Sequence, residues 1–275
     1  MTFSDDLKYV TELARSAGKI ARDAYGKVER LTKTHAAASA EAVTEADRAT
    51  QRHIVAGLRK RFPTDGIIGE ESDSGESITF DVKNPTGRNW VIDPIDGTNN
   101  FIAGLGLFCV CIGLLDKGYP ILGAVYDVTR DQMYFAGKGE SAWLDSRKLH
   151  VLETPLDDAG ILLLTSNVLD KSGNCPKWAI KWLAQTAWKV RILGSAALEA
   201  VNVAAGVAHG AVTVNGKLWD VVAPAAIVLE AGGLITSMDG KPVFPFNLVG
   251  YAGAKVPYIS AGAKAHEQMM EDLRS

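Results

Sequence analysis

Apolar positions recur every three or four residues over residues 7–24, which is the period of a helix that buries one face. Ser4 precedes this stretch as a candidate N-cap, and Gly26 follows its end. The next residues, 26–41, are polar and rich in alanine, and they show no clear period. The pattern therefore predicts an amphipathic helix followed by a mobile loop.

A second helix is expected to begin at Thr44, because Thr44 and Asp47 have the spacing of a capping box. It should end before Pro63. Residues 66–69 form a short apolar run between glycines, typical of a buried strand. The serine-rich stretch 73–86 is polar, and we expect a loop there.

Strand-like patterns dominate the following part of the chain. One apolar strand should stop near Asp93, because Pro94 has no N–H to donate to the ladder. A short helix or turn is expected over residues 99–105. Apolar runs separated by turn residues then predict an antiparallel meander over residues 108–115, 121–126, 132–136 and 143–151.

Beyond a change of pattern at residues 151–160, strand-like and helix-like runs alternate, which is typical of a parallel or mixed sheet covered by helices. We expect strands at 161–165, 190–193, 208–214, 234–237 and 258–261. Helices are expected at 177–188, 196–205 and 220–231, with another ending near Leu273. The sequence thus predicts an α+β N-terminal half with an antiparallel sheet, residues 1–152, and an α/β C-terminal half with a mixed sheet, residues 153–275.

Composition indicates an ordinary globular enzyme. Of the 275 residues, 47% are hydrophobic and 22% are charged. The net charge of −3 and the lack of a basic run argue against a nucleic-acid or anionic-membrane surface. We therefore expect a small-molecule ligand.

Cysteine usage and the first residues favour a cytoplasmic location. Three cysteines make a poor disulfide framework, and Cys109 and Cys111 alternate along an expected strand as small core residues. The chain begins without the basic and apolar regions of a secretory leader, and no apolar stretch is long enough to span a bilayer.

The segment Asp93-Pro94-Ile95-Asp96-Gly97-Thr98 places two carboxylates three residues apart where a strand breaks. The bend should turn both carboxylates out of the sheet, and Gly97 lets the backbone pass close to a ligand. Thr98 lies where a helix could begin, with N–H groups suited to an anion. Such a pattern also occurs in ordinary turns and helix caps. If the segment is a functional site, its carboxylates would bind a hard cation and its N–H groups would bind phosphate oxygens.

Two further acidic segments favour a functional site over an ordinary turn or helix cap. Glu70 and Glu71 follow the strand at 66–69, and neighbouring strand residues point to opposite faces, so only one should enter the site. Asp220 follows Trp219 at the start of an expected helix.

The chain resembles the inositol monophosphatase family in three segments: Gly69-Glu70-Glu71-Ser72, residues 90–98, and Leu218-Trp219-Asp220-Val221 followed by Glu230-Ala231-Gly232-Gly233. The resemblance implies a layered α-β-α-β-α fold and a lithium-sensitive phosphatase that uses two or three Mg²⁺ ions per site. It also implies a homodimer and a small sugar or polyol phosphate as substrate.

Residue roles follow from the same resemblance. The implied metal ligands are Glu70, Asp93, the carbonyl of Ile95, Asp96 and Asp220. The implied catalytic residues are Thr98, Asp47 and Glu70. The implied substrate contacts are Ile95, Asp96, Gly97, Thr98, Gly194, Ser195, Ala196, Thr213 and Asp220. For the Gly194-Ser195 pair, a simple helix cap is the alternative.

The chain departs from the family pattern at Thr213, where inositol-specific members place a glutamate that pairs ring hydroxyls. Asn215 or Lys217 could instead contact a different alcohol. Besides myo-inositol monophosphate, histidinol phosphate and a nucleotide 3′-phosphate are therefore candidate substrates. A non-catalytic regulatory relative is a further alternative, but such a copy would be expected to have lost a carboxylate.

Overall fold

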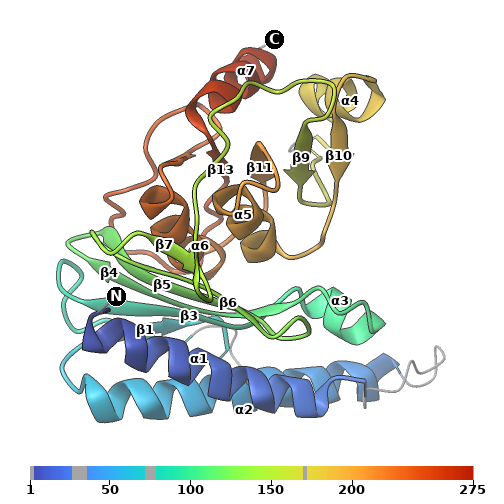
Figure 1. Cartoon of the computed structure of the whole chain (residues 1–275). Coiled ribbons are helices and arrows are strands. Elements are labelled where there is room, and N and C mark those ends of the chain that lie inside the picture. The colour runs from blue at the N-terminus through green and yellow to red at the C-terminus, as the bar shows by residue number, and fades with distance from the viewer. Residues whose placement is uncertain (1–2, 27–35, 72–78, 170–171, 275) are drawn as a thin grey trace.

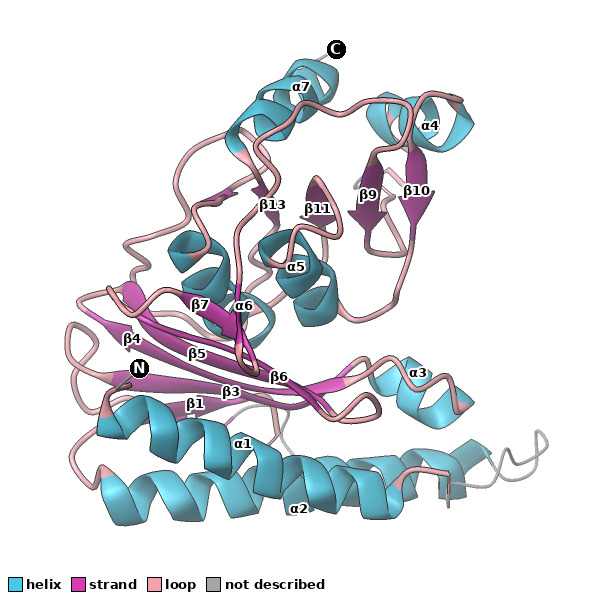
Figure 2. Cartoon of the chain, in the orientation of Figure 1, coloured by secondary structure: helices cyan, strands magenta, loops and turns pink. Residues whose placement is uncertain are grey.

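The computed structural model describes residues 3–26, 36–71, 79–169 and 172–274. Within these residues, helices and sheets alternate in five layers (Figure 1). Helices α1 and α2 cover the outer face of an eight-stranded sheet, α5 and α6 lie between this sheet and a five-stranded sheet, and α4 and α7 cover the far side (Figure 2). The layered α-β-α-β-α fold is thus confirmed.

The outer layer consists of α1 (Asp5–Ala24) and α2 (Ala36–Arg61). The Ser4 hydroxyl accepts a hydrogen bond from the Leu7 N–H, so the predicted cap of α1 is confirmed. The predicted start of α2 was wrong, because the helix begins at Ala36 and Thr44 lies within it. Alanine has the highest helix propensity, and no glycine or proline interrupts residues 36–44. The rest of the expected loop, residues 27–35, lies outside the described residues.

The larger sheet has the strand order β2-β1-β3-β4-β5-β6-β7-β8. Its strands are β1 (Gly66–Gly69), β2 (Thr79–Asp81), β3 (Asn89–Asp96), β4 (Cys109–Asp116), β5 (Tyr119–Asp127), β6 (Gln132–Gly137), β7 (Ala142–Leu144) and β8 (Arg147–Lys148). The predicted meander is confirmed for β4, β5 and β6, whereas its last element, expected over residues 143–151, consists of the two short strands β7 and β8. However, β1 and β3 run parallel, so the sheet is not purely antiparallel. Strand β2 also lies inside the stretch that we expected to be a loop.

Strand β3 does not stop at Asp93, contrary to the prediction. Asp93 pairs with Cys111 and Asp96 with Cys109, so three steps along β3 match two steps along β4. One extra residue in one strand is a β-bulge, and Pro94, which cannot donate to the ladder, lies within it. Because the bulge shifts the alternation by one residue, Asp93 and Asp96 share one face of the sheet.

The smaller sheet has the order β10-β9-β11-β13-β12, and it is mixed as predicted, with parallel pairing around β9 and antiparallel pairing around β13. Its strands are β9 (Ile161–Leu164), β10 (Lys189–Arg191), β11 (Gly210–Thr213), β12 (Leu234–Thr236) and β13 (Tyr258–Ala261). The remaining helices are α3 (Thr98–Ala103), α4 (Lys177–Ala184), α5 (Ala196–Ala204), α6 (Leu218–Glu230) and α7 (Ala263–Arg274). Helix α4 ends four residues before the predicted position 188.

Apolar side chains fill the spaces between the layers. Trp182 of α4 is buried among the apolar side chains of the smaller sheet and α7. Among the described helices, none is both long and apolar enough to cross a membrane. The division into halves at residues 152 and 153 stays a prediction.

Candidate active site

A polar pocket of about 290 Å³ opens where the end of β3 faces the smaller sheet. Segments far apart in the sequence meet there, from the end of β1 to the start of α6. Ten of the predicted site residues line the pocket: Glu70, Asp93, Ile95, Asp96, Gly97, Thr98, Gly194, Ala196, Thr213 and Asp220. The structure thus brings together most of the residues that the sequence motifs singled out.

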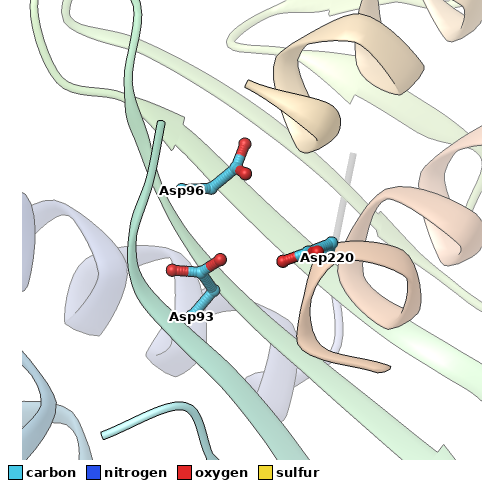
Figure 3. Close-up of side chains that lie close together, drawn as sticks. All are labelled: Asp93, Asp96 and Asp220. Carbon is cyan, nitrogen blue, oxygen red and sulfur yellow. The ribbon is translucent and has the colours of Figure 1, made fainter. Parts of the chain in front are cut away.

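Three carboxylates converge in this pocket. One oxygen each from Asp93, Asp96 and Asp220 lies within 4.8 Å of the others, and the side chains point into a common space (Figure 3). The β3 bulge supplies the first two, and the first turn of α6 supplies the third. Such a group of oxygen atoms has the chemistry that hard divalent cations prefer.

Burial and mutual repulsion make these negative charges costly. Desolvation, with repulsion from Asp220, raises the pKa of Glu70 to about 8. Desolvation and the neighbouring Asp96 raise the pKa of Asp220 to about 7, and the pKa of Asp93 is raised well above its usual range. Buried like charges of this kind require protons or cations to neutralise them. The donor set therefore fits bound divalent metal.

The backbone at Gly97 needs the absence of a side chain. Gly97 has φ 95°, in the left-handed region, and a Cβ atom there would lie 2.7 Å from the Leu107 carbonyl oxygen. Gly97 caps α3, as the sequence predicted for a helix starting near Thr98. The Thr98 hydroxyl donates to the Ile95 carbonyl at 3.0 Å, so this carbonyl, the threonine and the carboxylates lie in one pocket.

Asp47 lies behind the pocket, on α2, and does not line it. Its side chain is buried, and desolvation together with the charge of Glu71 raises its pKa to about 8. Asp47 and Glu70 also interact electrostatically. Because the Thr98 hydroxyl donates to Ile95, the expected link between Thr98 and Asp47 stays a prediction.

Comparisons with known proteins agree with this arrangement. A sequence profile described as "Inositol monophosphatase family" matches residues 4–275. This chain belongs to the inositol monophosphatase family. Its members include phosphatases, so the protein is an enzyme of the phosphate-ester hydrolase class.

Individual relatives cover most of the chain. It is 36% identical to the Nus factor SuhB of Pasteurella multocida, over 85% of each sequence. It is 33% identical to the histidinol-phosphatase of Mycobacterium tuberculosis, over 86% of this chain and 88% of that protein. An IMPase of Thermotoga maritima superposes with a TM-score of 0.79 at 29% identity, over 98% of this chain and 97% of that one. Fold and family therefore agree.

Ser195 forms a hydrogen bond with one of the pocket carboxylates and is itself buried. Its hydroxyl donates to Asp96 Oδ2, and the Ala197 N–H donates to the same oxygen at 2.9 Å. The hydroxyl also accepts from the Leu198 N–H at 3.3 Å, so the alternative of a helix cap is confirmed. Ser195 as a substrate contact stays a prediction, and its burial does not support it.

Sequence analysis missed Glu199 and Asn100, whose hydrogen bonds hold the loop before α5 in place beside α3. Glu199 Oε1 accepts from the N–H groups of Leu193 and Gly194 at 2.9 and 3.3 Å, and burial raises its pKa to about 8. Asn100 Nδ2 donates to the carbonyls of Leu193 and Leu107, each at 2.7 Å. No motif contains these residues, and the only signal was an acidic residue in the first turn of an expected helix.

The rim of the phosphatase pocket is neutral and polar. It includes residues that the sequence analysis did not select: Asn99, Thr165, Ser166, Asn167 and Gly216. Asn215 also lines the rim, and Lys255 Nζ donates to its Oδ1 at 2.6 Å while its amide donates to the Asn167 carbonyl at 2.9 Å. Lys217 instead donates to the Gly253 carbonyl. Of the two suggested alcohol contacts, Asn215 is the one on the pocket surface.

Proposed function

We propose that this family member is a Mg²⁺-dependent phosphomonoesterase that hydrolyses a small sugar or polyol phosphate, such as myo-inositol monophosphate, with a water nucleophile. The observation that carries the proposal is the convergence of Asp93, Asp96 and Asp220 in a pocket that also contains Glu70. Uncatalysed phosphate monoester hydrolysis is extremely slow, because water must attack a dianion.

The carboxylates would divide between two cation positions. Glu70, Asp93 and the Ile95 carbonyl would hold one Mg²⁺, and Asp93 would bridge to a second that Asp96 and Asp220 also hold. Bound Mg²⁺ would lower the pKa of a water molecule and neutralise charge that develops on the phosphate. The hydrogen bonds from Ser195 and Ala197 to Asp96 support this role, because they orient a carboxylate that faces the pocket.

The chain itself would position the water and the phosphate. The Thr98 hydroxyl would accept a hydrogen bond from the attacking water, and Asp47 would draw on the threonine proton. A hydroxyl alone is a poor base, so the Asp47 carboxylate would have to attract the threonine proton. The raised pKa of Asp47, about 8, favours this role. The N–H groups of Gly97 and Thr98 would hold phosphate oxygens, and Gly97 allows that close approach.

The rim would select the alcohol that leaves. Thr213 provides no negative charge for pairing ring hydroxyls, and the fixed amide of Asn215 offers a neutral polar contact. Histidinol phosphate and a nucleotide 3′-phosphate are therefore alternatives for the same chemistry, and one relative is itself a histidinol-phosphatase. A non-catalytic regulatory role is less well supported, because Glu70, Asp93, Asp96 and Asp220 all line one pocket.

A panel of phosphomonoesters tests the proposal. Purified protein would be assayed with myo-inositol monophosphate, histidinol phosphate, a nucleoside 3′-phosphate and p-nitrophenyl phosphate, ranked by kcat/KM. We expect turnover with Mg²⁺, loss of turnover with EDTA, and inhibition by lithium. Full activity in EDTA would contradict the metal assignment, and inactivity on every ester would favour the regulatory alternative.

Two further properties of the whole molecule are proposed: the homodimer rests on the family resemblance, and the location rests on cysteine usage. We expect a homodimer and a cytoplasmic location. Sedimentation velocity at micromolar concentration would show a species of about twice the 29.4 kDa chain mass if the dimer forms. A single species at the chain mass would contradict the dimer.

A further inference from the structure

A second cavity lies between the two sheets, away from the carboxylate pocket. Its volume is about 440 Å³, and it is bounded by β6, β7 and β8 on one side and by β9, β10 and α5 on the other. The two cavities share no lining residue among the described parts of the chain. This cavity is within the size range of small-molecule sites.

The charge of this cavity is opposite to that of the catalytic pocket. Its described lining includes Arg130, Arg147 and Arg191 but no acidic residue, although the chain as a whole carries a charge of −3. Arg130 is balanced by the buried Asp127, with 2.8 Å between Nη1 and Oδ2. The other two guanidinium groups have no carboxylate partner in the part of the chain that the structure describes.

The two uncompensated arginines are free to bind a ligand. Arg191 donates to the neighbouring Val190 carbonyl at 2.8 Å, which satisfies only one of its five N–H groups. The Arg147 side chain makes no hydrogen bond or ion pair with any described residue. Guanidinium groups bind phosphates and carboxylates through paired hydrogen bonds, so the cavity offers two oxyanion receptors.

Tyr134 adds a hydrogen-bond donor to the same lining. Its side chain is 5% exposed and lines the cavity, and its hydroxyl makes no hydrogen bond with a described residue. Burial and the negative charge of Asp127 raise the pKa of this hydroxyl, while Arg130 and Arg147 oppose the rise. The hydroxyl therefore keeps its proton at neutral pH and can donate it to an oxyanion.

The rest of the lining is apolar. Leu144, Ile161 and Leu163 form part of the surface beside the arginines. A cavity with both features fits a ligand that has an anionic group and an apolar body. Inorganic ions alone would leave the apolar part unfilled.

We propose that this cavity is an accessory site for a small organic oxyanion, in which Arg147, Arg191 and Tyr134 bind a phosphate or carboxylate group and the leucine and isoleucine side chains contact its apolar part. The site is separate from the proposed catalytic function and does not depend on it.

Isothermal titration of the full chain tests the proposal. Phenylphosphonate, which a phosphatase cannot hydrolyse, and benzoate are the probes, and they distinguish phosphate-like from carboxylate ligands. Metal is first removed with EDTA, and the chelator is then removed by dialysis into metal-free buffer, so that the carboxylates of the catalytic pocket repel the probes there and no chelator competes for the arginines. Compared with wild type, we expect the affinity for the probes to be about tenfold or more lower in the double variant Arg147→Gln/Arg191→Gln. In Tyr134→Phe it should be several-fold lower.

Lys148→Gln is the matched control. It removes one positive charge from the residue next to Arg147 on β8, and neighbouring strand residues face opposite sides. Unchanged binding in this control, with unchanged melting temperatures in all variants, would support the site. Three results would overturn it: no wild-type binding of either probe at millimolar concentration, equal binding by the double variant, or an equal loss in Lys148→Gln.

Discussion

The carboxylates at the base of the catalytic pocket and the neutral residues at its opening are called here its floor and its rim. The two differ in charge and in the hydrogen bonds that hold their side chains. On the floor, buried carboxylates come from a β-bulge and a helix start, and hydrogen bonds from α5 fix one of them. On the rim, the pocket lining is neutral: Asn215 is partly exposed there, whereas Thr213 lines the pocket as a buried side chain. The difference indicates that the floor determines the reaction, whereas the rim determines which alcohol leaves.

This contrast has a physical basis. Buried negative charges are unfavourable without cations or protons, so the floor has the chemistry expected of a metal site. Neutral amides and hydroxyls form hydrogen bonds with many partners, so a single substitution on the rim can change the preferred substrate while the reaction stays the same. The predictions below test each side of this division.

The largest effect is expected for Asp93→Asn, which removes the proposed bridging carboxylate. Turnover should fall by about 10³-fold or more, since a metal contributes several kcal/mol and each tenfold loss corresponds to about 1.4 kcal/mol. The melting temperature without metal should equal or exceed that of wild type, because the substitution removes a buried charge. Steady-state kinetics and calorimetry would check both. Near-normal turnover would contradict the role of Asp93.

Thr98→Ala should lower kcat by about 10²-fold, because it removes the hydroxyl proposed to orient the water. Thr98→Ser keeps that hydroxyl and is the control. We expect the serine variant to retain most of the wild-type kcat, with KM little changed in both variants. If the two variants behave alike, the hydroxyl is not involved.

On the rim, Thr213→Glu should raise kcat/KM for myo-inositol monophosphate relative to the other esters by about tenfold, equivalent to one hydrogen bond to a ring hydroxyl. Thr213→Gln keeps the size without the charge. The same panel of esters measures the ranking. An unchanged order of substrates in Thr213→Glu would remove Thr213 from the specificity residues.

The smallest effect is a pH-dependent stabilisation by Mg²⁺. The pKa values of Glu70 and Asp220, about 8 and 7, lie above their usual values, so folding favours their protonated forms. Stability of the metal-free protein should therefore fall as pH rises from about 5 through 8. Because Mg²⁺ binds the deprotonated groups, its effect on the melting temperature should be several degrees larger at pH 8 than at pH 6. An equal shift at both pH values would be inconsistent with this site.

Sequence alone predicted the layered fold and most of the pocket lining. Short motifs contain Asp93, Asp96 and Asp220, and the spacing of the first two around Pro94 indicated a shared face. The bulge that produces this face was not predicted, since its register depends on pairing with β4. The start of α2 was placed too late for a different reason: residues 36–44 show no clear apolar period, although their alanines favour a helix.

The supporting residues of the site could not be predicted. Asn100 reaches the Leu193 carbonyl only when the loop before α5 folds onto α3, and Glu199 binds backbone N–H groups of that loop without belonging to a motif. The rim residues Ser166 and Asn167 lie after β9, and their distance from Asn215 depends on the pairing of β9 with β11. Contacts of this kind depend on tertiary packing and leave no local pattern.

The central claim is that Asp93, Asp96 and Asp220 share divalent metal. Anomalous diffraction from crystals soaked in Mn²⁺, collected for wild type and for Asp93→Asn, tests it most directly. The account predicts strong anomalous peaks among these carboxylates and Glu70 in wild type, and their loss or marked weakening in the variant. Manganese bound elsewhere, or an empty pocket in crystals of an active enzyme, would contradict it.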